Sequence, residues 1–130
     1  MSKSQYLLLF RDTNWHRELS LNEIQEIMSR TNAWFEGLSQ QGIMKAGQPL
    51  DGVGAEVSYQ SGSVVDGPFT ETKESVGGYI LIEAASLEEA VAIARQNPMV
   101  PCGLKVEVRP VAEDCPASRL AKQKLFTVGA

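Results

Sequence analysis

The chain has 130 residues, of which 43% are hydrophobic and 22% charged, and its net charge at pH 7 is −4. These values are typical of one soluble globular domain with its own core. The acidic balance argues against sequence-independent nucleic-acid binding, which needs a basic face to neutralise phosphates. No apolar run reaches the length of a membrane span or a signal-peptide core, so the sequence predicts a cytoplasmic protein that contacts neither nucleic acid nor membrane.

The counts of metal-binding residue types are low. The chain contains two cysteines, Cys102 and Cys115, and one histidine, His16. The cysteines form no Cys-x-x-Cys motif, and one subunit cannot assemble a Cys/His zinc site from so few ligands. We therefore expect reduced thiols, no metal and no cofactor.

The first third of the chain predicts a strand, a helix and a second strand. The continuous apolar run at residues 5–10 predicts a strand that is covered on both faces. Ser20 and Glu23 have the spacing of a capping box, and a helical apolar stripe follows until Gly42, which terminates the helix. Residues 43–47 predict a short strand.

The middle of the chain predicts a hairpin and a long strand. Residues 55–59 and 63–65 read as two strands that are closed around residues 60–62. A charged, turn-rich segment follows, and residues 78–84 form another nearly unbroken apolar run.

The last third predicts a helix, a strand and a tail. A second capping box begins at Ser86, and the helix must end at Asn97 because Pro98 follows. Residues 105–110 alternate, which predicts a half-exposed strand. Residues 117–126 predict either a short helix or a frayed end, the frayed end being favoured.

The predicted order is β-α-β, a hairpin, and β-α-β, which indicates an α+β, ferredoxin-like domain with a mostly antiparallel sheet. We place this single domain at residues 1–111 and a C-terminal extension at residues 112–130. Two helices cover one face of the sheet, yet residues 6–10 and 79–82 are apolar at successive positions. A second copy is the simplest cover for the other face, so we expect a homodimer through the sheet faces.

Three segments carry a family resemblance. The strings DGPFTETKE (residues 66–74), GGYILIEAASLEEAVAIA (residues 77–94) and VEVRPV (residues 106–111) resemble the DGPF-domain branch of the YCII-related family. The resemblance implies a dimeric α+β barrel in which two ferredoxin-like sheets face each other. It also implies that some relatives are small enzymes and that others are associated with extracytoplasmic-function sigma factors.

One residue departs from the family pattern. The resemblance implies a His–Asp pair whose histidine lies on the first helix, ahead of a Leu-x-x-x-Gly pattern. Trp34 occupies that position here, ahead of Leu38 and Gly42. An indole cannot serve as a general base. Any acid–base chemistry must therefore use other residues.

Asp66 and His16 are the candidate catalytic residues. An aspartate at a turn usually accepts a hydrogen bond from the amide two residues later, but that residue is Pro68, which has no N–H. Asp66 therefore either caps another local amide or acts as a carboxylate at the barrel mouth, binding a ligand or taking a proton. His16 either is exposed or supplies a group that titrates near neutrality.

The candidate ligand-binding residues are bases, an acid and aromatics. The bases would fix an anionic ligand or form surface salt bridges, and the aromatics belong to the core, the interface or a pocket. The set consists of Arg11, Lys73, Glu71, Trp34, Tyr79 and Arg109. Gly77 and Gly78 indicate either close approach of another group to the backbone or a hinge at the entry to the strand.

Three functions fit these features, and the sequence does not decide whether the protein is an enzyme. The first is binding of a small carboxylated or aromatic metabolite near the DGPF loop, with acid–base catalysis as an extension. The second is a regulatory or interaction module associated with a sigma factor. The third is a structural homodimer organised by the DGPF turn.

Overall fold

The structure is a computed structural model that describes residues 2–68 and 75–128. Its elements follow one another along the chain as a strand, a helix, four strands, a helix, a 3-10 helix, a strand and a helix. They are β1 (Ser4–Arg11), α1 (Leu21–Gln40), β2 (Met44–Pro49), β3 (Ala55–Gln60), β4 (Ser63–Pro68), β5 (Val76–Ala84), α2 (Leu87–Arg95), η1 (Val100–Cys102), β6 (Lys105–Pro110) and α3 (Pro116–Val128).

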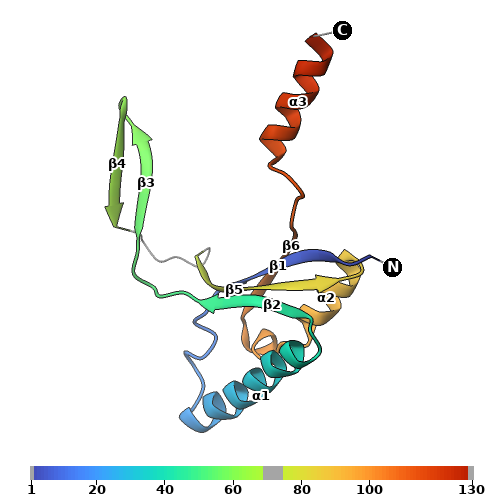
Figure 1. Cartoon of the computed structure of the whole chain (residues 1–130). Coiled ribbons are helices and arrows are strands. Elements are labelled where there is room, and N and C mark those ends of the chain that lie inside the picture. Colours follow the sequence, from blue (N-terminus) through green and yellow to red (C-terminus); the bar gives the residue numbers. More distant parts are fainter. Residues whose placement is uncertain (1, 69–74, 129–130) are drawn as a thin grey trace.

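Four strands form the central sheet in the order β2-β5-β1-β6, and all of its neighbours pair antiparallel. This order, with a helix after the first strand and another before the last, confirms the predicted ferredoxin-like α+β fold. Strands β3 and β4 form a separate two-stranded hairpin. Figure 1 shows the hairpin and α3 projecting from the body of the protein on the side opposite α1.

Helix α1 begins and ends where the sequence predicts. The Ser20 hydroxyl accepts from the Glu23 amide at 3.2 Å, and the Glu23 carboxylate accepts from the Ser20 amide at 3.0 Å. This complete capping box satisfies two amide donors that the first helical turn leaves without partners. Gly42 follows the helix with φ of 72°, a left-handed conformation that glycine adopts at little cost.

The core lies between the helices and one face of the sheet. Leu8 and Ile82 are fully buried in it, and Ile80 is nearly so. The core also receives Leu38 from α1, while the α1 residue Thr31 is buried and donates its hydroxyl proton to the Ile27 carbonyl at 2.7 Å. A buried hydroxyl is therefore satisfied within its own helix.

The opposite face of the sheet, which we call the open face, has no helix against it in the described part of the chain. Leu7 lies opposite Leu81, and Leu9 lies opposite Tyr79, across the β1–β5 pair. These four side chains are half-buried and alternate with the core residues, as the period of a strand requires. Ion pairs border them: Lys45 with Glu83 and Arg11 with Glu107 are two of these pairs. The prediction that one sheet face lacks a helical cover is thus confirmed.

The hairpin is longer than predicted, which changes the setting of Asp66. Strand β4 continues to Pro68, and Asp66 lies opposite Val57 in the ladder instead of in a turn. The turn is formed by Ser61 and Gly62, whose φ angles of 51° and 82° suit a two-residue hairpin. Pairing with β3 extends the strand through the Gly-Pro sequence, so the prediction of a DGP turn is wrong.

In the C-terminal extension, residues Pro116–Val128 form helix α3, which corresponds to the helical alternative for the tail. Arg119 in its first turns pairs with Asp114 at 3.1 Å, which ties the helix to the residues before it. Among the described residues, no helix is both long enough and apolar enough to cross a membrane.

Candidate functional site

A cavity of about 480 Å³, which we call the helix–sheet cavity, lies between α1 and the central sheet. This volume is within the range of small-molecule sites in proteins. On the helix side it is lined by Met28, Asn32 and Phe35, which follow one another at intervals of four and three residues on one stripe of α1. Trp15, from the loop that precedes α1, also lines it. The predicted stripe of α1 therefore serves both the core and this cavity.

Glycines form much of the wall on the sheet side. Gly47 from β2 and Gly77 and Gly78 from β5 all line the cavity. A Cβ at Gly47 would lie 2.6 Å from the Ile80 Cγ2 atom, and a Cβ at Gly77 would overlap the Thr13 side chain. Close approach to the backbone at Gly77 and Gly78, as the sequence predicts, is confirmed. At Gly47 and Gly77 the missing side chain makes room for the side chains of Ile80 and Thr13, which pack against the backbone there.

Methionines and aromatics supply most of the remaining lining. Met28, Met44 and Met99 border the cavity, and apart from Met1 they are all the methionines of the chain. Phe10 and Phe35 meet edge to face, with ring centroids 6.1 Å apart. Thioethers and aromatic rings make an apolar, polarisable surface.

Three uncharged polar residues line the cavity, namely Thr13, Asn32 and Gln48. Gln48 lies opposite Tyr79 in the β2–β5 pair, so the alternation of β2 assigns its side chain to the open face. The Thr13 hydroxyl and the Asn32 carboxamide make no hydrogen bond to any described residue. None of the described side chains that line the cavity carries a charge at neutral pH. The cavity can therefore bind an apolar molecule and can donate hydrogen bonds to it or accept them from it.

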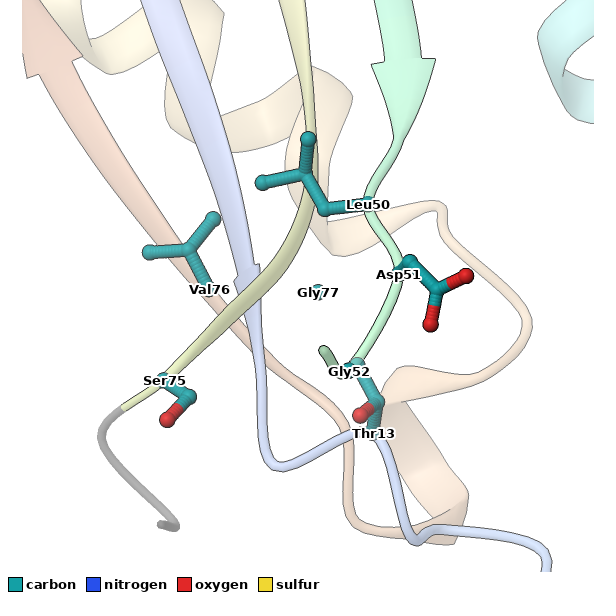
Figure 2. A pocket seen from close by; sticks show the side chains of 7 residues that line it. All are labelled: Thr13, Leu50, Asp51, Gly52, Ser75, Val76 and Gly77. Carbon is teal, nitrogen blue, oxygen red and sulfur yellow. The ribbon is translucent and has the colours of Figure 1, made fainter. Parts of the chain in front are cut away.

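A smaller pocket of about 160 Å³ adjoins the cavity and shares Thr13 and Gly77 with it. Figure 2 shows Thr13 beside Gly52 at its lower end, while the Asp51 carboxylate points away from Gly77. The Asp51 carboxylate instead accepts from the Val53 amide at 3.3 Å. The smaller pocket therefore continues the cavity at Thr13, whose hydroxyl is a polar group that both share.

The sequence profile of the YCII-related domain matches residues 5–113, which is most of the chain. The chain belongs to the YCII-related domain family. An uncharacterised protein of Rhizobium meliloti is 50% identical over 50 residues, a match that covers 38% of this chain and 40% of that protein's length. This similarity therefore concerns less than half of either protein.

Trp34, which stands where the family resemblance implies a histidine, is a packed indole. Trp34 is half-buried, and its ring centroid lies 5.0 Å from that of Phe35. Its Nε1 atom is buried and has no hydrogen-bond partner among the described residues. Trp34 packs against the Phe35 ring and is not among the described residues that line the helix–sheet cavity.

The two predicted catalytic residues lie apart in this YCII-related fold. Asp66 is exposed on β4, in the projecting hairpin. His16 is exposed in the β1–α1 loop, and its ring centroid lies 5.5 Å from that of Trp15. His16 is therefore next to a residue of the cavity, whereas Asp66 is not among the residues that line it.

Three of the predicted ligand-binding residues, Arg11, Arg109 and Tyr79, direct their side chains to the open face of the sheet. Arg11 lies 2.7 Å from Glu107, and Arg109 lies 3.2 Å from the same carboxylate. Tyr79 borders the cavity, and the alternation of β5 assigns its ring to the open face, so its backbone is the part that contributes. Glu71 and Lys73 lie outside the described residues.

Among the residues of the cavity that sequence reasoning missed are Thr13, Trp15, Asn32, Met44 and Met99. One signal was available for Asn32, which is a polar residue between the apolar positions 28 and 35 of a predicted helical stripe. The others come from a loop, a strand and the segment before η1, which only the tertiary fold brings together.

The described residues contain no group of three His, Cys, Asp or Glu side chains that could hold a metal ion. Both cysteines are free thiols. The backbone amides of Ser118 and Ala117, at the start of α3, lower the pKa of the exposed Cys115 thiol below its usual value of 9.0.

Proposed function

We propose that this YCII-related protein binds a small aromatic molecule in the helix–sheet cavity. The observation that carries the proposal is a cavity of about 480 Å³ with an apolar lining of methionines, aromatics and glycine backbone. Sites of this size and chemistry bind small ligands by burying apolar surface. Of the predicted carboxylated or aromatic metabolites, the aromatic class is the one that this lining supports.

A cavity-filling variant tests this proposal. A Cβ at Gly78 would meet Gln48 O at 3.3 Å, Pro49 Cα at 3.4 Å and Phe10 Cδ2 at 3.6 Å. Gly78→Val therefore requires the β2 backbone to shift by a few tenths of an ångström, and urea unfolding must first show that the variant is folded. We expect small aromatic compounds to raise the melting temperature of the wild type and not of this variant. Gly67→Val is the matched control, because a Cβ at Gly67 has no neighbour within 4 Å among the described residues. Equal ligand responses in all three proteins would overturn the proposal.

Catalysis is a further proposal that rests on the two titratable groups named by the sequence. We propose Asp66 and His16 as two separate candidate catalytic residues. Asp66 is supported by the DGPF string, which also supports assignment to the DGPF branch of the family, although the residue lies on the projecting hairpin outside the cavity lining. His16 is supported by its contact with Trp15, which lines the cavity. Loss of turnover of a bound ligand in both Asp66→Asn and His16→Gln, without loss of binding, is the expected result.

We also propose that the protein is a cytoplasmic homodimer that packs through its open face. Leu7, Leu9 and Leu81 support this, because they form an apolar stripe on the open face, and charged pairs border the stripe. The hairpin and α3 project on the same side (Figure 1), where a second copy would lie between them. Light scattering should give the mass of a dimer for the wild type and that of a monomer for Leu9→Lys.

A control and a contradicting result are available for the dimer. Leu87→Lys introduces the same charge at a leucine of α2 that is 46% exposed, and it should leave the dimer intact. A monomeric wild type, or a dimer that survives Leu9→Lys, would rule out this interface.

An interaction role without turnover is the second candidate, and the hairpin favours it. Val57, Tyr59 and Val64 are 67%, 70% and 73% exposed. Tyr59 lies opposite Val64, with Val57 two residues along the same strand, so all three share one face. An isolated hairpin with such a face is marginally stable in water. The family resemblance suggests an extracytoplasmic-function sigma factor as the partner, which can be titrated in purified form against wild type and Tyr59→Ser. We expect weaker binding to the variant. Equal binding to both proteins, or no detectable binding, would exclude this partner.

A further inference from the structure

The described lining of the helix–sheet cavity has no charged side chain, and this restricts the charge of the ligand that it can bind. The described side chains around it include no Asp, Glu, Lys, Arg or His. A charged group that moves from water into such surroundings loses hydration without gaining an opposite charge. The lining therefore selects against anions and cations alike.

Asn32 gives the cavity its directional polar group. It lies one helical turn from both Met28 and Phe35 and belongs to the same stripe of α1. Its carboxamide has no partner among the described residues, and it offers two N–H donors and one carbonyl acceptor. Thr13 adds a hydroxyl to the lining, beside Gly77. Such groups fit an uncharged substituent that both donates and accepts, such as an amide or a phenol.

The three internal methionines favour a ring in the remaining space. Met28, Met44 and Met99 reach the cavity from α1, from β2 and from the segment before η1. Thioether sulfur makes favourable contacts with aromatic rings, and the unbranched side chain adapts to their outline. Phe10 and Phe35, which meet edge to face in the lining, supply aromatic surface for such a ring.

We infer that the cavity selects a neutral, planar aromatic molecule with one uncharged hydrogen-bonding substituent, which Asn32 recognises. This inference rests on the proposed small-molecule binding and specifies its ligand class. Asn32 is a binding residue, exposed at the rim of the cavity, so its replacement leaves the core intact.

Three probes of nearly equal shape separate charge from size: benzamide is neutral, benzoate is an anion and benzamidinium is a cation. Protein labelled with ¹³C in the methionine methyl groups reports on binding directly, since an aromatic ring shifts the signals of methyl groups that it contacts. Met28→Leu, Met44→Leu and Met99→Leu assign the three signals. We expect benzamide to bind the wild type about tenfold more tightly than either ion, a difference that corresponds to about 1.4 kcal/mol.

Two substitutions then test the role of Asn32. Asn32→Leu should weaken benzamide binding about fivefold, the effect of losing a hydrogen bond in a partly buried site. Asn32→Asp should reverse the preference, so that benzamidinium binds more tightly than benzamide. Asn22→Asp is the matched control, because it places the same charge in α1 at an exposed position outside the cavity.

The possible failures are distinguishable. If none of the three probes shifts the methionine signals, the proposed binding function fails, and this inference fails with it. If the signals shift but benzoate or benzamidinium binds the wild type as tightly as benzamide does, or if the Asn32 variants behave like Asn22→Asp, binding stands and the inferred ligand class is wrong.

Discussion

The Arg11 Nη2 atom lies 2.7 Å from the Glu107 Oε1 atom, across the β1–β6 ladder on the open face. Glu107 also contacts Arg109 through its second oxygen, at 3.2 Å. One carboxylate thus holds two of the arginines that the sequence offered as anion-binding residues. Their described contacts organise the border of the open face.

Removing this carboxylate should cost stability in a salt-dependent way. The Arg11 and Glu107 side chains are 30% and 28% exposed, so solvent screens the pair only in part. We expect Glu107→Gln to lower the free energy of unfolding in urea by about 1 kcal/mol, and by less in about 1 M NaCl. Glu83→Gln is the control, since Glu83 holds one lysine in a more exposed pair. Equal losses in both variants, or no effect of salt, would contradict this account.

Gly47 should tolerate no side chain. A Cβ there would lie 2.6 Å from Ile80 Cγ2 and 2.9 Å from the Tyr79 carbonyl oxygen, and the carbonyl cannot rotate away because it belongs to the strand. We expect Gly47→Ala to lower the free energy of unfolding by about 1–3 kcal/mol, the usual cost of overpacking. Gly67→Ala, which meets nothing within 4 Å, should change it by less than about 0.5 kcal/mol. Similar values for the two variants would show that the sheet relaxes around residue 47.

The capping box should make helix α1 sensitive to acid. Hydrogen bonds from Ser20, first from its amide and then from its side chain, lower the pKa of Glu23 below 4.5. A carboxyl with a lowered folded-state pKa adds stability above its unfolded pKa, and that stability is lost as the pH falls through the folded value. Wild type should therefore lose more stability than Glu23→Gln between neutral pH and about pH 3. Glu26→Gln removes a charge of α1 that takes no part in the capping box, so its loss of stability on acidification should equal that of the wild type. If Glu26→Gln instead behaves like Glu23→Gln, the acid sensitivity comes from the helix charge and not from the capping box.

Cys115 should react as a thiolate at a pH where an ordinary thiol is mostly protonated. The amides of Ser118 and Ala117 lower its pKa from 9.0, and the thiol is exposed. Alkylation followed by mass spectrometry should give a rate at Cys115 that rises at lower pH than it does in concentrated urea, where α3 is unfolded. Identical profiles with and without urea would show that α3 does not hold the thiol.

The sequence predicts the fold well because local signals agree with the tertiary structure. Ser20 and Glu23 begin α1, and the alternation of Val106 with Glu107 defines β6. Both signals are local, since a cap involves residues three apart and a strand repeats every second residue. The order of the elements then leaves few topologies.

The errors fall where partners distant in sequence decide the outcome. Asp66 reads as a turn residue beside Gly67 and Pro68, but β3 supplies a ladder partner that keeps it in a strand. The helix–sheet cavity depends on Met99 meeting Met44 and Met28, which no period or motif in the sequence connects. Which residues of loops and strand edges line the cavity is decided by tertiary packing, and no local sequence pattern predicts it.

The separation of the hairpin from the central sheet has a consequence for engineering. The Leu50 amide donates to the Gly77 carbonyl at 3.0 Å, and Pro49 lies opposite Gly78, so the chain leaves the sheet and returns to it at neighbouring positions. Residues between them can therefore be exchanged for a short turn, or for a foreign segment whose ends are close together, without altering how β2 pairs with β5. We therefore expect the hairpin position to accept foreign segments. New binding groups could be introduced there while the central sheet keeps its fold.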